Sequence, residues 1–323
     1  MNSTSNPIGL FGKLNASVLL AITPEYGKIK AAKQANLSRD AESRPGTFSI
    51  QPEYRKIAGV KVRLAMGGKQ NGPIVLLLNP LPQSILAFDL IWTKLGEHFR
   101  LVALDLPGFG RSEGGLEFMT FEAQGGFLAA FMQALDLHHV HIVGPDIGMS
   151  AALHYVIHQQ HDVQSLVIGD GPGIVPSSNG SVIQKMVDSA FWRLVFKIAG
   201  ADAFVEAGNR LGYVNYVPNA QEIADYVASY AGRIGPVTQW FAKYPESLAT
   251  VDPYLAGIDL PVKVFWGDLD QLLYVNNAHR LHERLKRSEL TVFQHCGHFS
   301  YQDKADDFAK MVVAWVGGGY RVV

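Results

Sequence analysis

One aspartate of the sequence stands where a nucleophile is expected. The motif GPDIG at positions 144–148 joins an apolar run to an alanine-rich stretch, and Asp146 lies at its centre between two glycines. A sharp strand-to-helix turn that exposes its central side chain leaves no room for bulk on either flank. The motif is therefore typical of a nucleophile elbow with Asp in the nucleophile position. Aspartate is also a favoured helix N-cap, and the motif alone leaves both interpretations open.

A carboxylate partner and a base follow two later apolar runs. The motif WGDLD ends at Asp270, and the motif HCGH ends at His298. His298 follows a glycine and precedes the final helical segment, which is the place for a general base on a loop. We prefer it to His295, which lies closer to the preceding strand. We prefer Asp270 to Asp268 as the carboxylate partner, because Asp268 directly follows the strand end and is interpreted as a loop cap.

Such a set of residues implies attack on a saturated carbon. An aspartate is ionised at pH 7, so Asp146 needs no base to displace an epoxide oxygen or a halide. The resulting alkyl ester would be hydrolysed by a water that His298, oriented by Asp270, deprotonates. Backbone N–H groups of Ile147 and of the loop at 79–83 would then bind the oxyanion.

The elements that must position these loops alternate along the chain. Residues 61–65 alternate polar and apolar, as expected for a half-buried strand at an antiparallel start. Apolar runs typical of buried strands lie at 74–78, 101–104, 140–143, 166–168, 262–266 and 290–293. Between them lie helix-length segments at 86–99, 120–135, 149–158, 277–286 and 303–316. This alternation predicts an α/β fold with a mostly parallel central sheet and helices on both faces.

Two segments fall outside the alternation. Residues 173–254 are interpreted as a helical lid over the carboxyl ends of the strands, where open α/β sheets bind ligands. A separate helical domain with an aromatic core is the alternative. Residues 1–46 are expected to be an N-terminal arm with a helix near 24–37, and a docking arm and a partly disordered leader both stay open. The core then comprises residues 47–172 and 255–323.

Composition limits the partners. The 323 residues have 28 Lys and Arg against 29 Asp and Glu, a net charge of −1, which makes no electrostatic case for nucleic acid or an anionic membrane. One cysteine, Cys296, excludes an intramolecular disulfide framework and a cysteine-rich zinc site. The apolar run at 18–22 is too short to span a membrane. We expect a cytoplasmic protein without metal or cofactor, acting on a small-molecule substrate and water, and leave a homodimer open.

Together these motifs resemble the Asp-nucleophile branch of the α/β-hydrolase superfamily, which includes epoxide hydrolases and haloalkane dehalogenases. The resemblance covers residues 47–316 and includes the chain order Asp146, Asp270, His298. The branch's H-G-x-P loop corresponds to NPLP at 79–82, which implies Leu81 as the second oxyanion donor beside Ile147. The branch's D-x-P-G-x-G-x-S loop corresponds to DLPGFGRS at 105–112.

The resemblance also bears on the leaving group. Haloalkane dehalogenases typically have Trp after the nucleophile, where this chain has Ile147. Epoxide hydrolases usually place two lid tyrosines over the nucleophile, where this chain has Trp192 and Phe241. Trp192 is a candidate N–H donor, and Tyr213 and Tyr244 are candidate hydroxyl donors.

These comparisons favour one function and keep two others. The resemblance implies an epoxide hydrolase that converts an apolar or aromatic epoxide into a vicinal diol. A haloalkane dehalogenase-type hydrolase is the first alternative, because it would use the same triad with other donors. A relative that binds a ligand without catalysis is the second.

Overall fold

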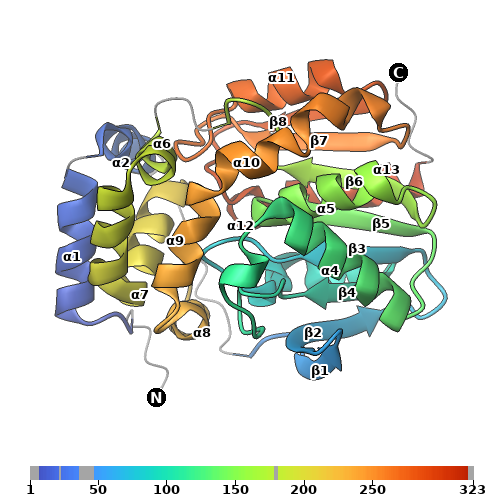
Figure 1. Cartoon of the computed structure of the whole chain (residues 1–323), viewed down its shortest axis with the longest axis horizontal. Coiled ribbons are helices and arrows are strands. Elements are labelled where there is room, and N and C mark those ends of the chain that lie inside the picture. The colour runs from blue at the N-terminus through green and yellow to red at the C-terminus, as the bar shows by residue number, and fades with distance from the viewer. Residues whose placement is uncertain (1–6, 22, 36–46, 178–180, 319–323) are drawn as a thin grey trace.

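The computed structural model describes residues 7–21, 23–35, 47–177 and 181–318, and centres them on one eight-stranded sheet (Figure 1). In chain order its strands are β1 (Glu53–Ile57), β2 (Val60–Gly68), β3 (Ile74–Leu78), β4 (Arg100–Leu104), β5 (Val140–Pro145), β6 (Val163–Gly169), β7 (Val262–Gly267) and β8 (Ser288–Phe293). In the sheet they follow the order β1-β2-β4-β3-β5-β6-β7-β8.

The sheet is parallel from β4 to β8 and antiparallel at its start. β1 pairs antiparallel with β2, and β2 pairs antiparallel with β4. The central strands β3 and β5 are buried almost throughout, as expected for strands covered on both faces. Each predicted apolar run lies in a strand, and the predicted α/β fold class is confirmed.

Helices cover both faces of the sheet. Those of the core are α3 (Asp89–Gly96), α4 (Phe121–Ala134), α5 (Ile147–His158), α11 (Asn276–Arg284), α12 (Ser300–Asp303) and α13 (Ala305–Gly317), with short 3₁₀ turns η1 (Ile85–Phe88) and η2 (Leu116–Phe118). α4 packs against α5 (Figure 1), and α3 packs against α13. The loops that end the parallel strands therefore start from a rigid base.

A helical insert separates β6 from β7, in the region that the sequence analysis placed at 173–254. It holds α6 (Val182–Asp188), α7 (Ala190–Gly212), α8 (Ala220–Tyr230), α9 (Ile234–Ala242), α10 (Tyr244–Ala249) and the 3₁₀ turn η3 (Asp252–Gly257). Within α7 the backbone leaves helical geometry at Gly200, whose φ of 83° suits glycine. Figure 1 shows the insert at one end of the sheet, beside the blue N-terminal helices.

Two helices precede the core, α1 (Leu10–Ala21) and α2 (Pro24–Ala35). The helix expected near 24–37 corresponds to α2, and residues 36 and 37 lie outside the described residues. α1, which the sequence analysis did not predict, packs on α7 so closely that a Cβ at Gly12 would lie 2.6 Å from the Cβ of Asp202. Among the described residues, none of the helices has the length and apolar character that a membrane span requires.

Candidate active site

Asp146 occupies a strained turn between β5 and α5. Its φ of 49° and ψ of −120° lie outside the regions that non-glycine residues favour, a strain that functional sites often hold. Its side chain makes no capping hydrogen bond to α5. The flanking glycines are required sterically, because a Cβ at Gly144 would lie 2.7 Å from the carbonyl oxygen of Gly148. A Cβ at Gly148 would lie 2.8 Å from the Cβ of Leu78. The geometry is that of an elbow, and an N-cap role does not account for it.

Two backbone amides lie against the Asp146 carboxylate. The N–H of Leu81 donates to Oδ2 over 2.6 Å, and the neighbouring N–H of Ile147 lowers the pKa of the carboxyl group. Burial raises the pKa of Asp146 to about 6, although His298 and the two amides oppose the shift. The carboxyl group is mostly ionised at pH 7, and its Oδ2 is held by Leu81, one of the two donors expected to form an oxyanion hole.

His298 and Asp270 complete a triad. His298 Nδ1 lies 2.8 Å from Asp270 Oδ2, and its Nε2 lies 3.9 Å from Asp146 Oδ1. The other Asp270 oxygen accepts the N–H groups of Leu272 and Leu273 at 2.8 and 3.0 Å. Burial disfavours the imidazolium, but the carboxylates of Asp270 and Asp146 outweigh it and raise the pKa of His298 to about 9. The structure thus brings together the three side chains that the sequence analysis selected.

Asp268 and His295, the alternatives to Asp270 and His298, lie outside the triad. Asp268 accepts the N–H of Cys296 at 3.0 Å, which ties the two loops together as a cap. His295 is exposed, with a φ of 52°. Neither lines the cavity described below.

The loop that carries Leu81 is fixed from both sides. The Asn79 side-chain oxygen accepts the N–H of Leu106 at 2.7 Å, so the amide of Asn79 holds the neighbouring DLPGFGRS loop. The Gln83 side chain donates to Gln302 at 2.8 Å, and the Tyr230 hydroxyl of the insert donates to the Gln83 carbonyl at 2.8 Å. These bonds set the position of the amide that binds Asp146.

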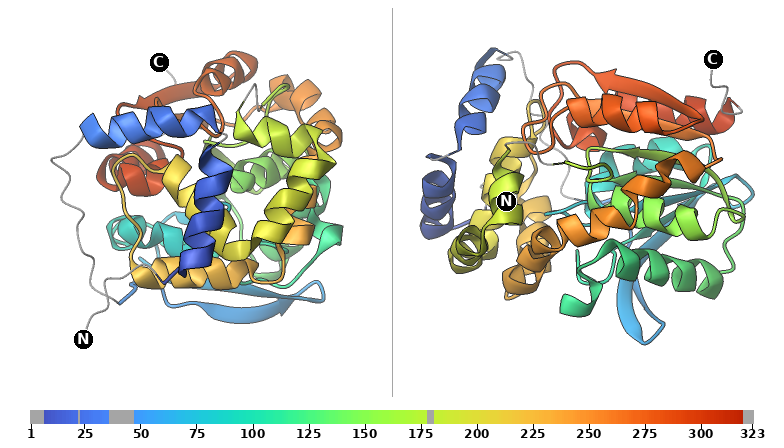
Figure 2. Two further views of the ribbon diagram at one scale, coloured as in Figure 1. Left: turned by 90° about the vertical axis from the view of Figure 1, so that its left-hand side faces the viewer. Right: turned by 45° about the horizontal axis from the view of Figure 1, so that its top comes forward.

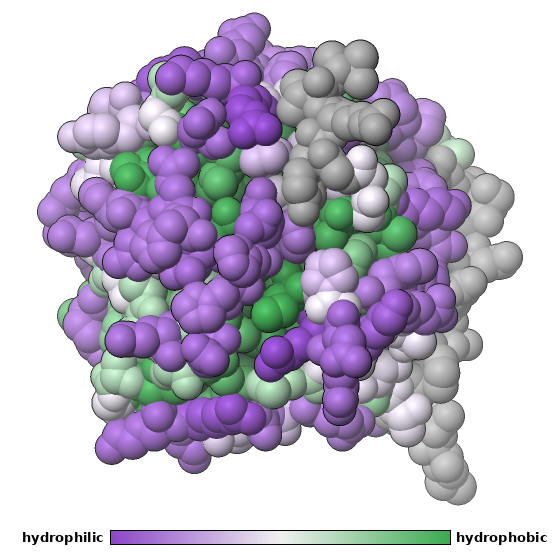
Figure 3. Space-filling model, turned by 90° about the vertical axis from the view of Figure 1, so that its right-hand side faces the viewer, coloured by the Kyte–Doolittle hydropathy of each residue, from purple (hydrophilic) through white to green (hydrophobic). Residues whose placement is uncertain are grey.

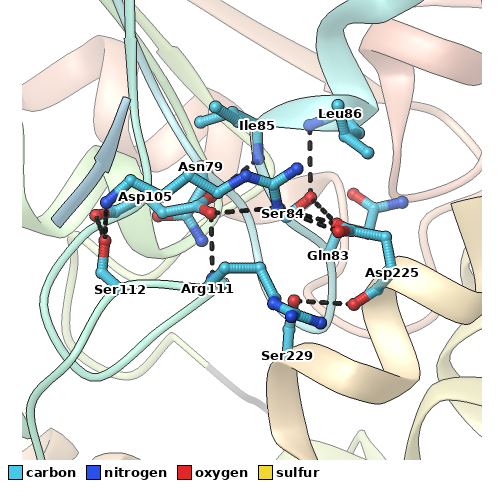
Figure 4. Close-up of polar contacts among 12 residues, drawn as sticks. Asn79, Gln83, Ser84, Ile85, Leu86, Asp105, Arg111, Ser112, Asp225 and Ser229 are labelled. Carbon is cyan, nitrogen blue, oxygen red and sulfur yellow. Dashed lines mark hydrogen bonds and ion pairs between the residues drawn. The ribbon is translucent and has the colours of Figure 1, made fainter. Parts of the chain in front are cut away.

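A buried ionic cluster anchors the insert to this loop (Figure 4). Asp225 of α8 accepts the Ser84 hydroxyl at 2.5 Å and pairs with the guanidinium of Arg63 on β2 at 3.0 Å. Arg63 also lies 3.7 Å from Asp105, which accepts the N–H of Ile85 at 2.7 Å. Burial raises the pKa of Asp105 to about 7 against the effect of Arg63. One helix of the insert is thereby tied to both loops of the site.

Sequence analysis missed a third acid in the same region. Asp170 directly follows β6, is fully buried, and accepts the Ser300 hydroxyl at 2.6 Å and the N–H of Gly267 at 3.2 Å. Burial, and then the nearby Asp270, raise its pKa well above its usual value. Its position at a strand end is the signal that could have found it, since Asp146 and Asp270 follow strands in the same way.

A cavity opens over the triad beneath the insert and α1. Asp146, His298 and Leu81 lie on its core side, and the insert contributes Phe241 and Tyr244. The other described lining residues are Leu19, Leu20, Thr23, Pro82, Val182, Ile183, Met186, Phe196, Phe204, Ala207, Gly208, Leu211, Leu272 and Leu273. No sequence signal tied the N-terminal helices to this wall.

Two of the predicted lid donors lie elsewhere. Trp192 is not among the lining residues and instead lies beneath the Lys185 ammonium, 5.6 Å from the ring centre. Tyr213 is buried outside the cavity and donates to Gln302 at 2.5 Å. The expectation for Trp192 rested on alignment of the insert, and Tyr213 was one of the candidate phenols there. Local sequence does not say which way a helix turns its side chains.

The cavity offers few polar groups. Apart from Asp146 and His298, its described lining has only the hydroxyls of Tyr244 and Thr23, and Thr23 donates to the carbonyl of Leu19 at 2.9 Å. Burial and the nearby Asp146 raise the pKa of Tyr244 well above its usual value, so it keeps its proton. Over the described part of the chain, no three His, Cys, Asp or Glu side chains are grouped to hold a metal ion.

Comparison with known proteins places this geometry in a family. The family model described as alpha/beta hydrolase fold matches residues 73–305. The chain belongs to this family. The sequence-based resemblance to the α/β-hydrolase superfamily is thereby confirmed. An uncharacterised protein of Mycobacterium bovis is 23% identical over 277 residues, which cover 80% of this chain and 79% of that protein.

Two solved structures that resemble this chain are a haloalkane dehalogenase and an epoxide hydrolase. A haloalkane dehalogenase from Bradyrhizobium elkani is 20% identical and superposes with a TM-score of 0.73, over 84% of this chain and 99% of that chain. An epoxide hydrolase is 21% identical with a TM-score of 0.71, again over 84% and 99%. At these identities the likeness shows the fold.

Proposed function

We propose that this protein is a hydrolase that opens an apolar epoxide to a vicinal diol through an ester on Asp146. One observation carries the proposal. The Asp146 carboxylate has Oδ2 in hydrogen bond with the Leu81 N–H at 2.6 Å, and Oδ1 lies 3.9 Å from the base His298. One oxygen is therefore held as an oxyanion would be, while the other is available for attack.

In the first step Asp146 Oδ1 attacks an epoxide carbon. A C–O bond forms, the ring C–O bond breaks, and the departing oxygen takes the proton of the Tyr244 phenol. An alkoxide leaves poorly unless an acid stabilises it, and Tyr244 is the cavity phenol near Asp146. The product is a hydroxyalkyl ester of Asp146.

In the second step water hydrolyses the ester. His298 accepts a water proton while the water oxygen attacks the Asp146 carbonyl carbon, and the amides of Leu81 and Ile147 bind the oxyanion. Collapse releases the diol oxygen, which takes the proton left on the carboxyl group. Tyr244 regains its proton from the His298 imidazolium once the ester has formed, and the proton that His298 then takes from water stays on it, as in the free protein, so the sum is epoxide plus water giving diol.

The charge of Asp146 controls whether His298 can act as the base of the second step. In the free protein its pKa is raised to about 9, first by Asp270 against burial and then by Asp146. Ester formation removes the negative charge of Asp146. The pKa of His298 therefore falls once the ester is present. The imidazolium gives its proton to the Tyr244 phenolate, and the resulting neutral imidazole can act as a base.

The donors of the cavity favour an epoxide over a haloalkane. A departing halide needs N–H or other donors but no proton, whereas a departing alkoxide needs a proton. The described lining has a phenol and contains no Trp, Asn, Gln, Lys or Arg side chain. The otherwise apolar wall suits an apolar substrate, and we assign the insert the role of a lid over it.

Parallel assays with an epoxide and a chloroalkane of similar size test the proposal. We expect diol from the epoxide and no halide release. Tyr244→Phe should slow ester formation about 100-fold, because it removes the acid, while hydrolysis of the preformed ester continues at the original rate. Halide release without diol formation would replace the epoxide assignment by a dehalogenase. Absence of any protein adduct with either substrate would indicate a binding protein.

A further inference from the structure

Exposed apolar side chains gather at one end of the molecule. Thirteen large apolar side chains are exposed among the described residues, and seven of them belong to α1 and to the first half of α7. They are Leu10, Phe11, Leu14, Val18, Phe191, Leu194 and Ile198. We call these seven residues the apolar end face. Figure 2 (left) shows α1 in front, with α6 and α7 beside it, on the end of the molecule beyond the insert.

α1 is apolar on two opposite sides. Its inner side packs on α7 and lines the cavity through Leu19 and Leu20. Its outer side carries Phe11, which is 82% exposed, Leu14, which is 56% exposed, and Val18, at the i, i+3, i+7 spacing of one helix stripe. Apolar residues around a whole helix are typical of a helix covered on both sides, and here protein covers one side.

Positive charge accompanies the apolar end face. Residues 7–35 and 181–199 have seven basic residues against the two acids Glu25 and Asp188, and Glu25 is buried. The basic residues are Lys13, Lys28, Lys30, Lys33, Lys185, Arg193 and Lys197. Seven positive and two negative charges give +5 here, in a chain whose net charge is −1. The net charge of −1 for the whole chain thus conceals a local excess of positive charge, which the sequence analysis did not consider.

The opposite end of the molecule differs. Figure 3 shows that face covered mainly by hydrophilic residues, with apolar residues in small areas between them. At the end that carries α1, the acids Asp202 and Glu206 of the second half of α7 lie beneath α1 rather than on the apolar end face, and Glu206 pairs with Arg210 at 2.7 Å. The combination of apolar and basic residues is thus a property of one end.

We propose that the apolar end face docks on a lipid bilayer that contains anionic phospholipids. Large apolar side chains together with exposed lysines, here Lys28, Lys30 and Lys197, are the composition that binds in the plane of a bilayer interface. The apolar side chains would enter the acyl boundary, and the lysines would contact the phosphate headgroups. Because the inner side of α1 lines the cavity, docking would place the cavity wall next to apolar compounds dissolved in the bilayer.

Vesicle flotation with the full chain tests the proposal. The probes are vesicles of phosphatidylcholine with phosphatidylglycerol, and vesicles of phosphatidylcholine alone. We expect the protein to float with the anionic vesicles at low salt, less at high salt, and weakly with the neutral ones. Leu14→Asp should lower the bound fraction about ten-fold or more, since it removes an apolar side chain from the interface.

Matched variants separate docking from general effects. Tyr254→Asp on η3 changes a side chain that is also 56% exposed and should bind as the unmodified protein does. Lys30→Glu with Lys197→Glu should weaken binding to anionic vesicles, whereas Lys310→Glu on α13 should not. Thermal unfolding of each variant checks that it is folded.

Three results would overturn the proposal. They are absence of flotation with anionic vesicles at low salt, equal binding by Leu14→Asp, and a dimer in sedimentation that Leu14→Asp converts to monomer. The last would show that the apolar end face joins two copies of the chain. None of them depends on the reaction assigned to Asp146.

Discussion

The pKa of Asp146 determines how the first step of the proposed reaction depends on pH. Burial raises the pKa of Asp146 to about 6, and attack requires the ionised form. Ester formation should therefore slow as the pH falls through about 6, whereas a carboxylate at its usual pKa of 3.8 would stay active to much lower pH. Rapid quenching followed by intact mass measurement of the ester gives this rate. An inflection near pH 4 would contradict the role of the buried carboxylate.

Removal of the base should separate the two steps. His298→Gln leaves Asp146 able to attack but takes away the group that activates water. One equivalent of ester should then form and persist, and the protein mass should rise by the mass of the substrate. The exposed His295 provides the control, because His295→Gln should turn over normally. Normal turnover by His298→Gln would remove that residue from the mechanism.

At the scale of elements, α8 holds the insert on the core through charge. The side chains of Arg63 and Asp225 are 7% and 15% exposed, so the pair is largely shielded from water. Asp225→Ala leaves the shielded guanidinium of Arg63 with only the more distant Asp105, at 3.7 Å, as its partner. We therefore expect the free energy of unfolding to fall by about 3 kcal/mol. Urea unfolding measures this loss.

A surface ion pair gives the matched comparison. Lys94 and Asp306 pair across α3 and α13, with side chains 50% and 71% exposed. Solvent screens such a pair, so Asp306→Ala should cost less than about 1 kcal/mol. Equal losses for Asp225→Ala and Asp306→Ala would mean that the buried cluster does not anchor the insert.

Sequence patterns predicted the strands of the central sheet from β2 to β8 and most helices of the core, and missed β1 and α1. The runs at 74–78 and 140–143 are continuous and apolar because helices cover both sides of β3 and β5. β1 has the sequence EYRKI and is exposed except at Ile57, so no apolar period marks it. α1 was not predicted because its apolar residues lie on two sides of the helix and so form no single apolar stripe.

The candidate site follows the same division. Strand-end position and chain order were enough to select Asp146, Asp270 and His298, which the structure brings together. Their roles remain predictions. The cavity wall depends on how α1 and the insert pack, so Leu20 could not be found from the sequence, and Trp192 was assigned to a wall that it does not line.

At the scale of the whole molecule, α1 closes the cavity from outside the core. Gly12→Val would place side-chain atoms where Gly12 meets Asp202, and should displace α1 from α7. We expect KM for an apolar substrate to rise several-fold and proteolysis of the N-terminal segment to accelerate. Gly9→Val is the control, since no heavy atom lies within 4 Å of a Cβ there. Unchanged KM and proteolysis in Gly12→Val would show that α1 does not close the cavity.

The ester on Asp146 is the central claim, and oxygen labelling tests it most directly. A single turnover in ¹⁸O water, with protein in excess over epoxide, is followed by mass measurement of the diol and of the peptide that contains Asp146. The account predicts an unlabelled diol, whose new oxygen comes from the carboxylate, and one ¹⁸O atom in Asp146. A diol that carries ¹⁸O after one turnover, with unlabelled Asp146, would contradict it.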